Sequence, residues 1–282
     1  MDSDKFVWID FYMEFANVLL EYKHNRKELI SKLQNVYESI NRKFPKIESN
    51  DHPEDICPFT TFAMFNKGLT NKSRAEIIEG LANEFHVNAQ IPKTFDGIPV
   101  VNNLAATFYC WLPDRGEHDI DNLWDTFEAA IHYADDSSLE NKERLIELYD
   151  VVKEQTGVHW NLTMGLFWIR PYVYLNLDSR NRWFLNLENN YSNESKELFA
   201  SIEKTMPDGA LYFKVINECK KIFESGKYEY IYLFHIFLLY PLHFLMKLTI
   251  RRVNYPILLI SAGSAQLFRY CVNWAGQLSL RM

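Results

Sequence analysis

Apolar residues recur every three or four positions along most of the chain, which is the spacing of one face of an α-helix. Between residues 8 and 22 the pattern places these side chains on a single face: Trp8, Phe11, Phe15, Val18, Leu19 and Tyr22. A second helix is predicted after Asn25, because Asn25 and Glu28 have the spacing of a capping box. Its apolar positions continue in register to Phe44, and Pro45 ends it. The chain therefore opens with two predicted amphipathic helices.

The same periodicity predicts seven further helices between residues 59 and 224. Their ranges are 59–65, 71–85, 119–131, 139–155, 162–169, 194–204 and 209–224. Residues 106–112 fit a buried strand or a short helix, residues 172–177 have the composition of a strand, and residues 180–187 are ambiguous. No linker rich in Pro, Gly and Ser divides residues 1–229. The predicted fold is mainly α (α+β with a minor β component), a multi-helix globular body.

The composition is that of a folded protein, and the distribution of charged residues divides the chain into two parts. Hydrophobic residues make up 48% and aromatic residues 15% of the 282 positions, well above the level of a disordered chain. Residues 1–229 hold all 37 acidic residues and 25 of the 30 basic ones, a formal charge of −12. Residues 230–282 hold five basic residues and no acid. We therefore separate a helical domain, 1–229, from an acid-free hydrophobic tail, 230–282.

Three interpretations of the tail are open. Residues 231–246 form an uncharged apolar run, but this run is shorter than the roughly 20 residues that span a bilayer, and Pro241 interrupts it. The tail is a membrane-contacting segment, a buried C-terminal part of the fold, or the product of a truncation or frameshift. The complete absence of acids favours the last, because soluble domains average roughly 25% charged residues.

The sequence favours a cytoplasmic protein without a recognisable catalytic motif. The N-terminus MDSDKF is acidic and shows no signal-peptide pattern. Four widely spaced cysteines without a C-x-x-C pair are typical of a reducing compartment. Phosphate-binding-loop, dinucleotide-binding, zinc-protease and nucleophile-elbow motifs do not occur. We expect no enzymatic activity, no metal and no cofactor in this chain.

Residues 114–121 form the richest polar cluster, with four carboxylates and one histidine. Within it, His118, Asp119 and Asp121 have the residue types of a divalent-metal or acid–base site. The favoured alternative is a solvated loop whose aspartates lie at the positive end of the following helix.

Two further positions carry reactive groups. Cys57 follows His52 by five residues, and together they have the residue types of a thiol–histidine pair. A lone cysteine is more often a small buried apolar side chain, which we favour here. His159 lies between Val158 and Trp160 and is expected to be structural rather than a ligand.

The segment 159–184 interleaves aromatic residues with arginines. It contains Trp160, Trp168, Arg170, Tyr172, Tyr174, Arg180, Arg182 and Trp183. Aromatic faces and guanidinium groups together suit stacking on bases and contact with phosphates. The alternative is a core helix and strand whose arginines pair with local acids such as Asp178. The acidic total of the domain favours that alternative, since nonspecific DNA affinity is largely electrostatic.

Several runs of residues resemble the N-terminal region of McrB-like proteins, the AAA+ NTPases of modification-dependent restriction. These runs are 10–16 (DFYMEFA), 58–68 (PFTTFAMFNKG), 95–100 (FDGIPV), 114–124 and 160–183. The resemblance covers nearly all of 1–229. The region of those proteins that is matched does not include their NTPase domain. It implies a region that recognises modified DNA, with an McrC-like nuclease subunit as the partner of the motor.

The resemblance and the residues together lead to one functional prediction. We expect a DNA (modified-base) recognition region in which Trp160, Trp168, Tyr172 and Trp183 stack on bases and Arg170, Arg180 and Arg182 contact phosphates. The alternatives are a structural or protein-interaction module that assembles with itself or a partner, and a tail-anchored membrane protein.

Overall fold

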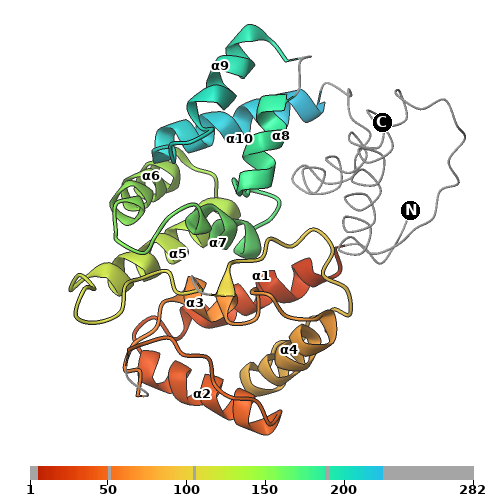
Figure 1. Cartoon of the computed structure of the whole chain (residues 1–282), viewed down its shortest axis with the longest axis vertical. Helices are drawn as coiled ribbons and strands as arrows, with labels where there is room; N and C mark the ends of the chain where they lie inside the picture. The colour runs from red at the N-terminus through yellow and green to blue at the C-terminus, as the bar shows by residue number, and fades with distance from the viewer. Residues whose placement is uncertain (1–5, 50–51, 104–105, 188–190, 225–282) are drawn as a thin grey trace, which may run out of the picture. The chain divides into compact units, whose positions relative to one another are not determined.

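The computed structural model describes residues 6–49, 52–103, 106–187 and 191–224, and within this part the protein is helical. Figure 1 shows the helices in chain order. Their bounds are α1 Trp8–Leu20, α2 Arg26–Ser39, α3 Pro58–Ala63, α4 Asn71–Phe85, α5 Asp119–Asp135, α6 Leu139–Lys153, α7 Asn161–Ile169, α8 Ser179–Leu187, α9 Asn193–Ser201 and α10 Gly209–Glu224. The mainly α prediction is confirmed.

The minor β component reduces to a single isolated bridge, between Lys67 and Val101, within the described residues. Residues 172–177 are largely buried but do not form a strand. Side chains satisfy their backbone instead: the Tyr212 hydroxyl accepts from the Leu175 amide at 3.1 Å and donates to the Leu175 carbonyl at 2.7 Å. The Leu177 amide donates to the Thr163 hydroxyl at 3.0 Å. The strand-like composition therefore reflects burial rather than pairing.

Helix ends follow local chemistry in some places and depart from the prediction in others. The Thr70 hydroxyl accepts from the Ser73 amide and caps α4, which begins at Asn71 as the range 71–85 predicted. Helix α2 ends at Ser39 rather than at Phe44, because Asn41 adopts a left-handed conformation with φ of 53°. Residues 180–187, ambiguous in sequence, lie within α8.

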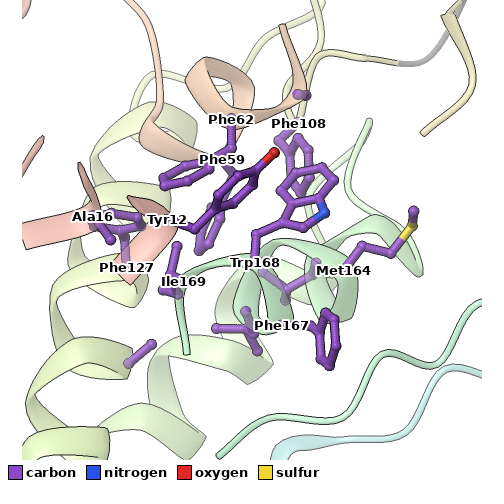
Figure 2. Packing of buried hydrophobic residues seen from close by; sticks show 14 of the residues in the cluster. Tyr12, Ala16, Phe59, Phe62, Phe108, Phe127, Met164, Phe167, Trp168 and Ile169 are labelled. Atoms are coloured by element: carbon purple, nitrogen blue, oxygen red, sulfur yellow. The ribbon is translucent and has the colours of Figure 1, made fainter. Parts of the chain in front are cut away.

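An aromatic core lies where α1, α3, α5 and α7 meet (Figure 2). Tyr12, Phe62 and Trp168 are fully buried in it, and the Phe62 and Trp168 rings stack with centroids 6.4 Å apart. Helix α5 also packs along α6, and α10 packs on α6 and α9. Helix α8 packs on α9, which leaves part of α8 on the surface. The core thus fixes α7, and the chain that leaves α7 leads to α8.

No described helix is long and apolar enough to cross a membrane. The predicted tail, 230–282, lies outside the described residues.

Candidate functional site

Two of the predicted DNA-contacting residues lie in the core, and this part of the prediction is wrong. Trp168 is fully buried, and its indole N–H donates to the Pro99 carbonyl at 2.9 Å. Arg170 is only 3% exposed and donates to Asn17 Oδ1 at 2.6 Å and to the Ile169 carbonyl at 2.9 Å. Its Nε also lies 3.5 Å from an Asp135 carboxylate oxygen. The sequence prediction grouped Trp168 and Arg170 with the other DNA-contacting residues by residue type alone. The packing of α7 instead buries both side chains.

Trp160 and Arg182 do come together. The Arg182 guanidinium carbon lies 3.6 Å from the centroid of the Trp160 ring, which is a close cation–π stack. Arg182 Nη1 donates to the Glu203 carbonyl at 3.0 Å, so the guanidinium is held from a second side. Both side chains are half-buried. The stack is a fixed platform that joins the start of α7, α8 and the end of α9.

Beside this platform, α8 presents an arginine and a tryptophan to solvent. Arg180 and Trp183 are three residues apart and therefore share one face of the helix. Trp183 is 43% exposed, and the Arg180 guanidinium makes no hydrogen bond or ion pair with the described residues. We call Arg180, Trp183 and the Trp160–Arg182 stack the α8 surface. Tyr172, also predicted to stack on bases, is 45% exposed in the turn after α7.

The N-terminus of α8 is already occupied by a side chain of the protein. Asp178 Oδ1 accepts from the backbone amides of Arg180 at 3.0 Å and Asn181 at 2.9 Å. These amides are consequently not available to a phosphate, although helix N-termini often bind one. Contact with an anion at the α8 surface therefore depends on the Arg180 side chain.

The 114–121 cluster does not gather a metal site. Within the described residues, no group of three His, Cys, Asp or Glu side chains converges. Asp119 Oδ2 accepts from the Gly116 amide at 2.9 Å, and Asp121 contacts Arg26 at 2.6 Å and the His118 ring at 3.9 Å. The favoured alternative, aspartates at the beginning of the helix, matches the first turn of α5.

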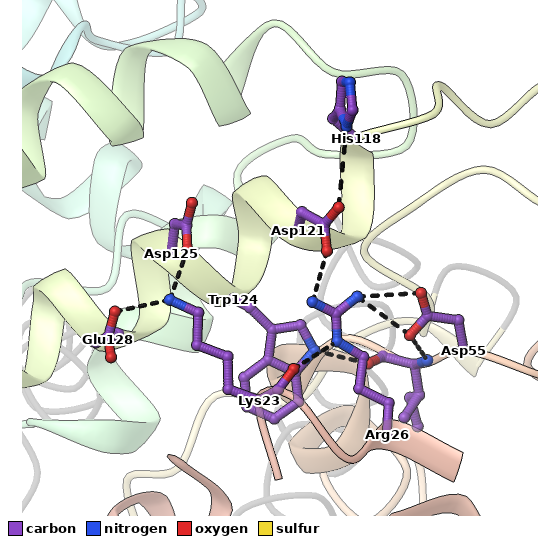
Figure 3. Close-up of polar contacts among 9 residues, drawn as sticks. Lys23, Arg26, Asp55, His118, Asp121, Trp124, Asp125 and Glu128 are labelled. Atoms are coloured by element: carbon purple, nitrogen blue, oxygen red, sulfur yellow. Dashed lines mark hydrogen bonds and ion pairs between the residues drawn. The ribbon is translucent and has the colours of Figure 1, made fainter. Parts of the chain in front are cut away.

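Asp121 belongs instead to a network of ion pairs that the sequence did not reveal (Figure 3). Arg26 lies between Asp121 and Asp55, while Lys23 contacts Asp125 at 2.6 Å and Glu128 at 2.7 Å. We call this network the α5 clasp. It lies next to a surface pocket of about 350 Å³ lined by Lys23, His24, Arg26, Lys27, Glu54 and Asp55. The partners are separated by up to about a hundred residues along the chain, so no local sequence signal predicts them.

Cys57 has a structural role. Its sulfur accepts from the Thr60 amide at 3.3 Å and so caps α3. Burial raises the pKa of the thiol from 9.0 to about 12, which leaves it protonated and unreactive near neutral pH. His52 is exposed and is not among the groups that affect the thiol. His159 is also exposed.

The comparisons with known proteins identify a family but not an activity. No curated protein and no solved structure matches this chain. A family model described as "Domain of unknown function (DUF8425)" matches residues 8–233. This match includes every described helix and ends close to Glu229, the last acid of the sequence. The chain therefore belongs to the DUF8425 family.

Proposed function

We propose that the domain recognises DNA, including modified bases, through the α8 surface, as a recognition region without catalytic activity of its own. The observation that carries the proposal is the Trp160–Arg182 stack beside the exposed Trp183 and the unpaired Arg180. Indole faces and guanidinium groups are the side chains that stack on bases and contact phosphates. The resemblance to McrB-like recognition regions points the same way.

Local charge supports this choice of surface. Residues 155–187 contain three arginines and one acid, Asp178, and because Arg170 is buried, Arg180 and Arg182 against Asp178 leave a formal surface charge of +1 within a domain of −12. Arg170 places its charge in the core, but Arg180 and Arg182 reach the α8 surface. A local basic surface is what an acidic protein needs to approach a polyanion, because the rest of the molecule repels it.

The proposal is tested by measuring binding of the full chain to DNA with and without 5-methylcytosine, offered both as duplexes and as single strands. We expect binding that is stronger for the methylated form. Arg180→Ala should weaken binding several-fold and reduce its salt dependence, because one phosphate contact is lost.

The matched control is Arg144→Ala, which removes an exposed arginine from α6 and changes the net charge equally. Equal weakening by both variants would assign the effect to net charge rather than to the α8 surface. If a folded sample binds none of the four DNAs, DNA recognition by this chain is excluded. A structural or protein-interaction module would then be the better interpretation.

A further inference from the structure

We propose that the ligand of the α8 surface is single-stranded nucleic acid, with an unpaired base stacked on Trp183, rather than the outside of a duplex. This inference rests on the proposed function and specifies its substrate class. Two features of the α8 surface support it: the exposed Trp183, and the small number of cations that are not already engaged within the protein.

The exposed indole is the first argument. Trp183 is 43% exposed, and its neighbour Phe184 is buried, so the helix is anchored while the indole remains outside. Bases in a duplex stack on each other, so a protein can contact only their edges and the phosphates. An indole gains stacking energy only from a base whose face is open, which is the condition in a single strand.

The small number of available cations is the second argument. Duplex binding depends on several Lys or Arg contacts to phosphates, because the phosphate backbone supplies most of the affinity. Of the three arginines between 155 and 187, Arg170 is buried and Arg182 lies on Trp160 with a hydrogen bond to the Glu203 carbonyl. Arg180 remains, and Asp178 already occupies the amides at the beginning of α8. One free guanidinium in this described segment, on a domain of charge −12, is a poor duplex site.

The Trp160–Arg182 stack completes the surface without adding a phosphate contact. Arg182 and Trp183 are adjacent, so their side chains leave α8 about 100° apart around its axis. The stack fixes one side of the helix, and Trp183 projects from the neighbouring side. Arg182 is thus a positioning residue, and stacking on Trp183 rather than charge should dominate binding.

The test compares a labelled single strand of about 12 nucleotides with the duplex of the same sequence, a length within the usual range of single-strand sites. The full chain is used at about 50 and 200 mM salt. We expect the single strand to bind at least about tenfold more tightly, with a log–log salt slope near −0.7, the value for about one phosphate contact. Trp183→Ala should weaken single-strand binding about tenfold, a typical effect of losing one stacked base, and Trp183→Phe should restore most of it.

Trp111→Ala is the control, because Trp111 is also exposed, at 36%, but lies in the loop before α5. It should leave binding unchanged. Tighter binding to the duplex, or a slope of a multi-contact site, overturns this inference while leaving DNA recognition intact. Preference for a methylated duplex over both single strands overturns it as well. Absence of binding to every DNA removes the proposed function and this inference together.

Discussion

Glu48 shows what a single buried charge requires in this protein. Its side chain is 4% exposed and forms an ion pair with Arg115, while its Oε1 accepts from the amides of Ser49 and Leu112. Burial by itself raises the pKa of this carboxyl, but the two amides and the guanidinium lower it below the ordinary 4.5. The loop after Phe108 is therefore fastened to residues 47–49 by this carboxylate and by the Tyr109 hydroxyl, which donates to the Ile47 carbonyl at 3.3 Å.

Glu48→Gln should lower the free energy of unfolding by about 3 kcal/mol, because Arg115 then keeps a largely buried charge without a partner. Urea denaturation at pH 7 measures this loss. The folded-state pKa is lowered, so the stabilisation is complete above pH 4.5 and is lost as the pH falls through the folded-state pKa. The difference between wild type and variant should accordingly shrink in acid.

Glu54→Gln is the matched control for this prediction. Glu54 and Lys27 are 3.8 Å apart, and both side chains are at least 80% exposed. Exposed pairs of this kind contribute little, so no measurable change is expected. A loss that persists undiminished in strong acid would show that the charge of Glu48 is not what stabilises the loop.

At the scale of helices, the contact between α3 and α7 depends on the absence of a side chain at Gly165. A Cβ atom built at this position would lie 2.6 Å from Cδ1 of Phe59, whose ring is fully buried. Figure 2 shows Phe59 and Phe62 of α3 close to Trp168 of α7. The glycine lets the two helices approach closely enough for these rings to pack.

Gly165→Ala should therefore destabilise the protein by about 1–3 kcal/mol through overpacking. This would occur even though alanine is the better helix former by about 1 kcal/mol in an exposed helix. Thermal unfolding followed by circular dichroism measures the change. In the Phe59→Ala background, where Cγ, Cδ1 and Cε1 of the ring are removed, the same substitution should cost less; an equal cost in both backgrounds would rule out the clash.

At the scale of the whole domain, the α5 clasp joins the turn between α1 and α2 to a helix about a hundred residues later. Three of its carboxylates, Asp121, Asp125 and Glu128, lie on one side of α5, where Lys23 and Arg26 neutralise part of their charge. The clasp fixes the N-terminal helices against α5 and disperses part of the negative charge of the domain.

The Arg26–Asp121 pair should show a coupling below about 1 kcal/mol in a double-mutant cycle of Arg26→Gln with Asp121→Asn, because Asp121 is 53% exposed and solvent screens the pair. The coupling should be the same with and without Mg²⁺. Asp119→Asn, on the same helix, where the carboxylate accepts from the Gly116 amide, should show no coupling to Arg26. A coupling that appears only with Mg²⁺ would revive the metal interpretation of residues 118–121.

For the proposed DNA-binding surface, we expect local charge to matter more than the net charge of the domain. Residues 1–229 carry −12, while Arg180, Arg182 and Asp178, at or beside α8, together carry +1. We expect the proposed nucleic-acid ligand to be repelled by the rest of the domain, and we therefore propose a short local contact through stacking.

The sequence by itself determined the helical class and most helix positions. The period of apolar residues depends only on local geometry, and it placed α1, α4, α5 and α10 within a few residues of their observed bounds. It also identified the segment that contains Trp160 and Arg182, because interleaved aromatic residues and arginines are visible in one dimension.

Only the tertiary structure decided which of those side chains reach solvent. Trp168 and Trp183 have the same side chain, yet Trp168 is fully buried and Trp183 is 43% exposed. Burial depends on which distant helices pack against each position, and the partners of Arg170, Asn17 and Asp135, are remote in the chain. Packing against distant helices also explains why residues 172–177 do not form the predicted strand. Their backbone partners include Tyr212 of α10, whose hydroxyl replaces a neighbouring strand, and no local pattern encodes that contact.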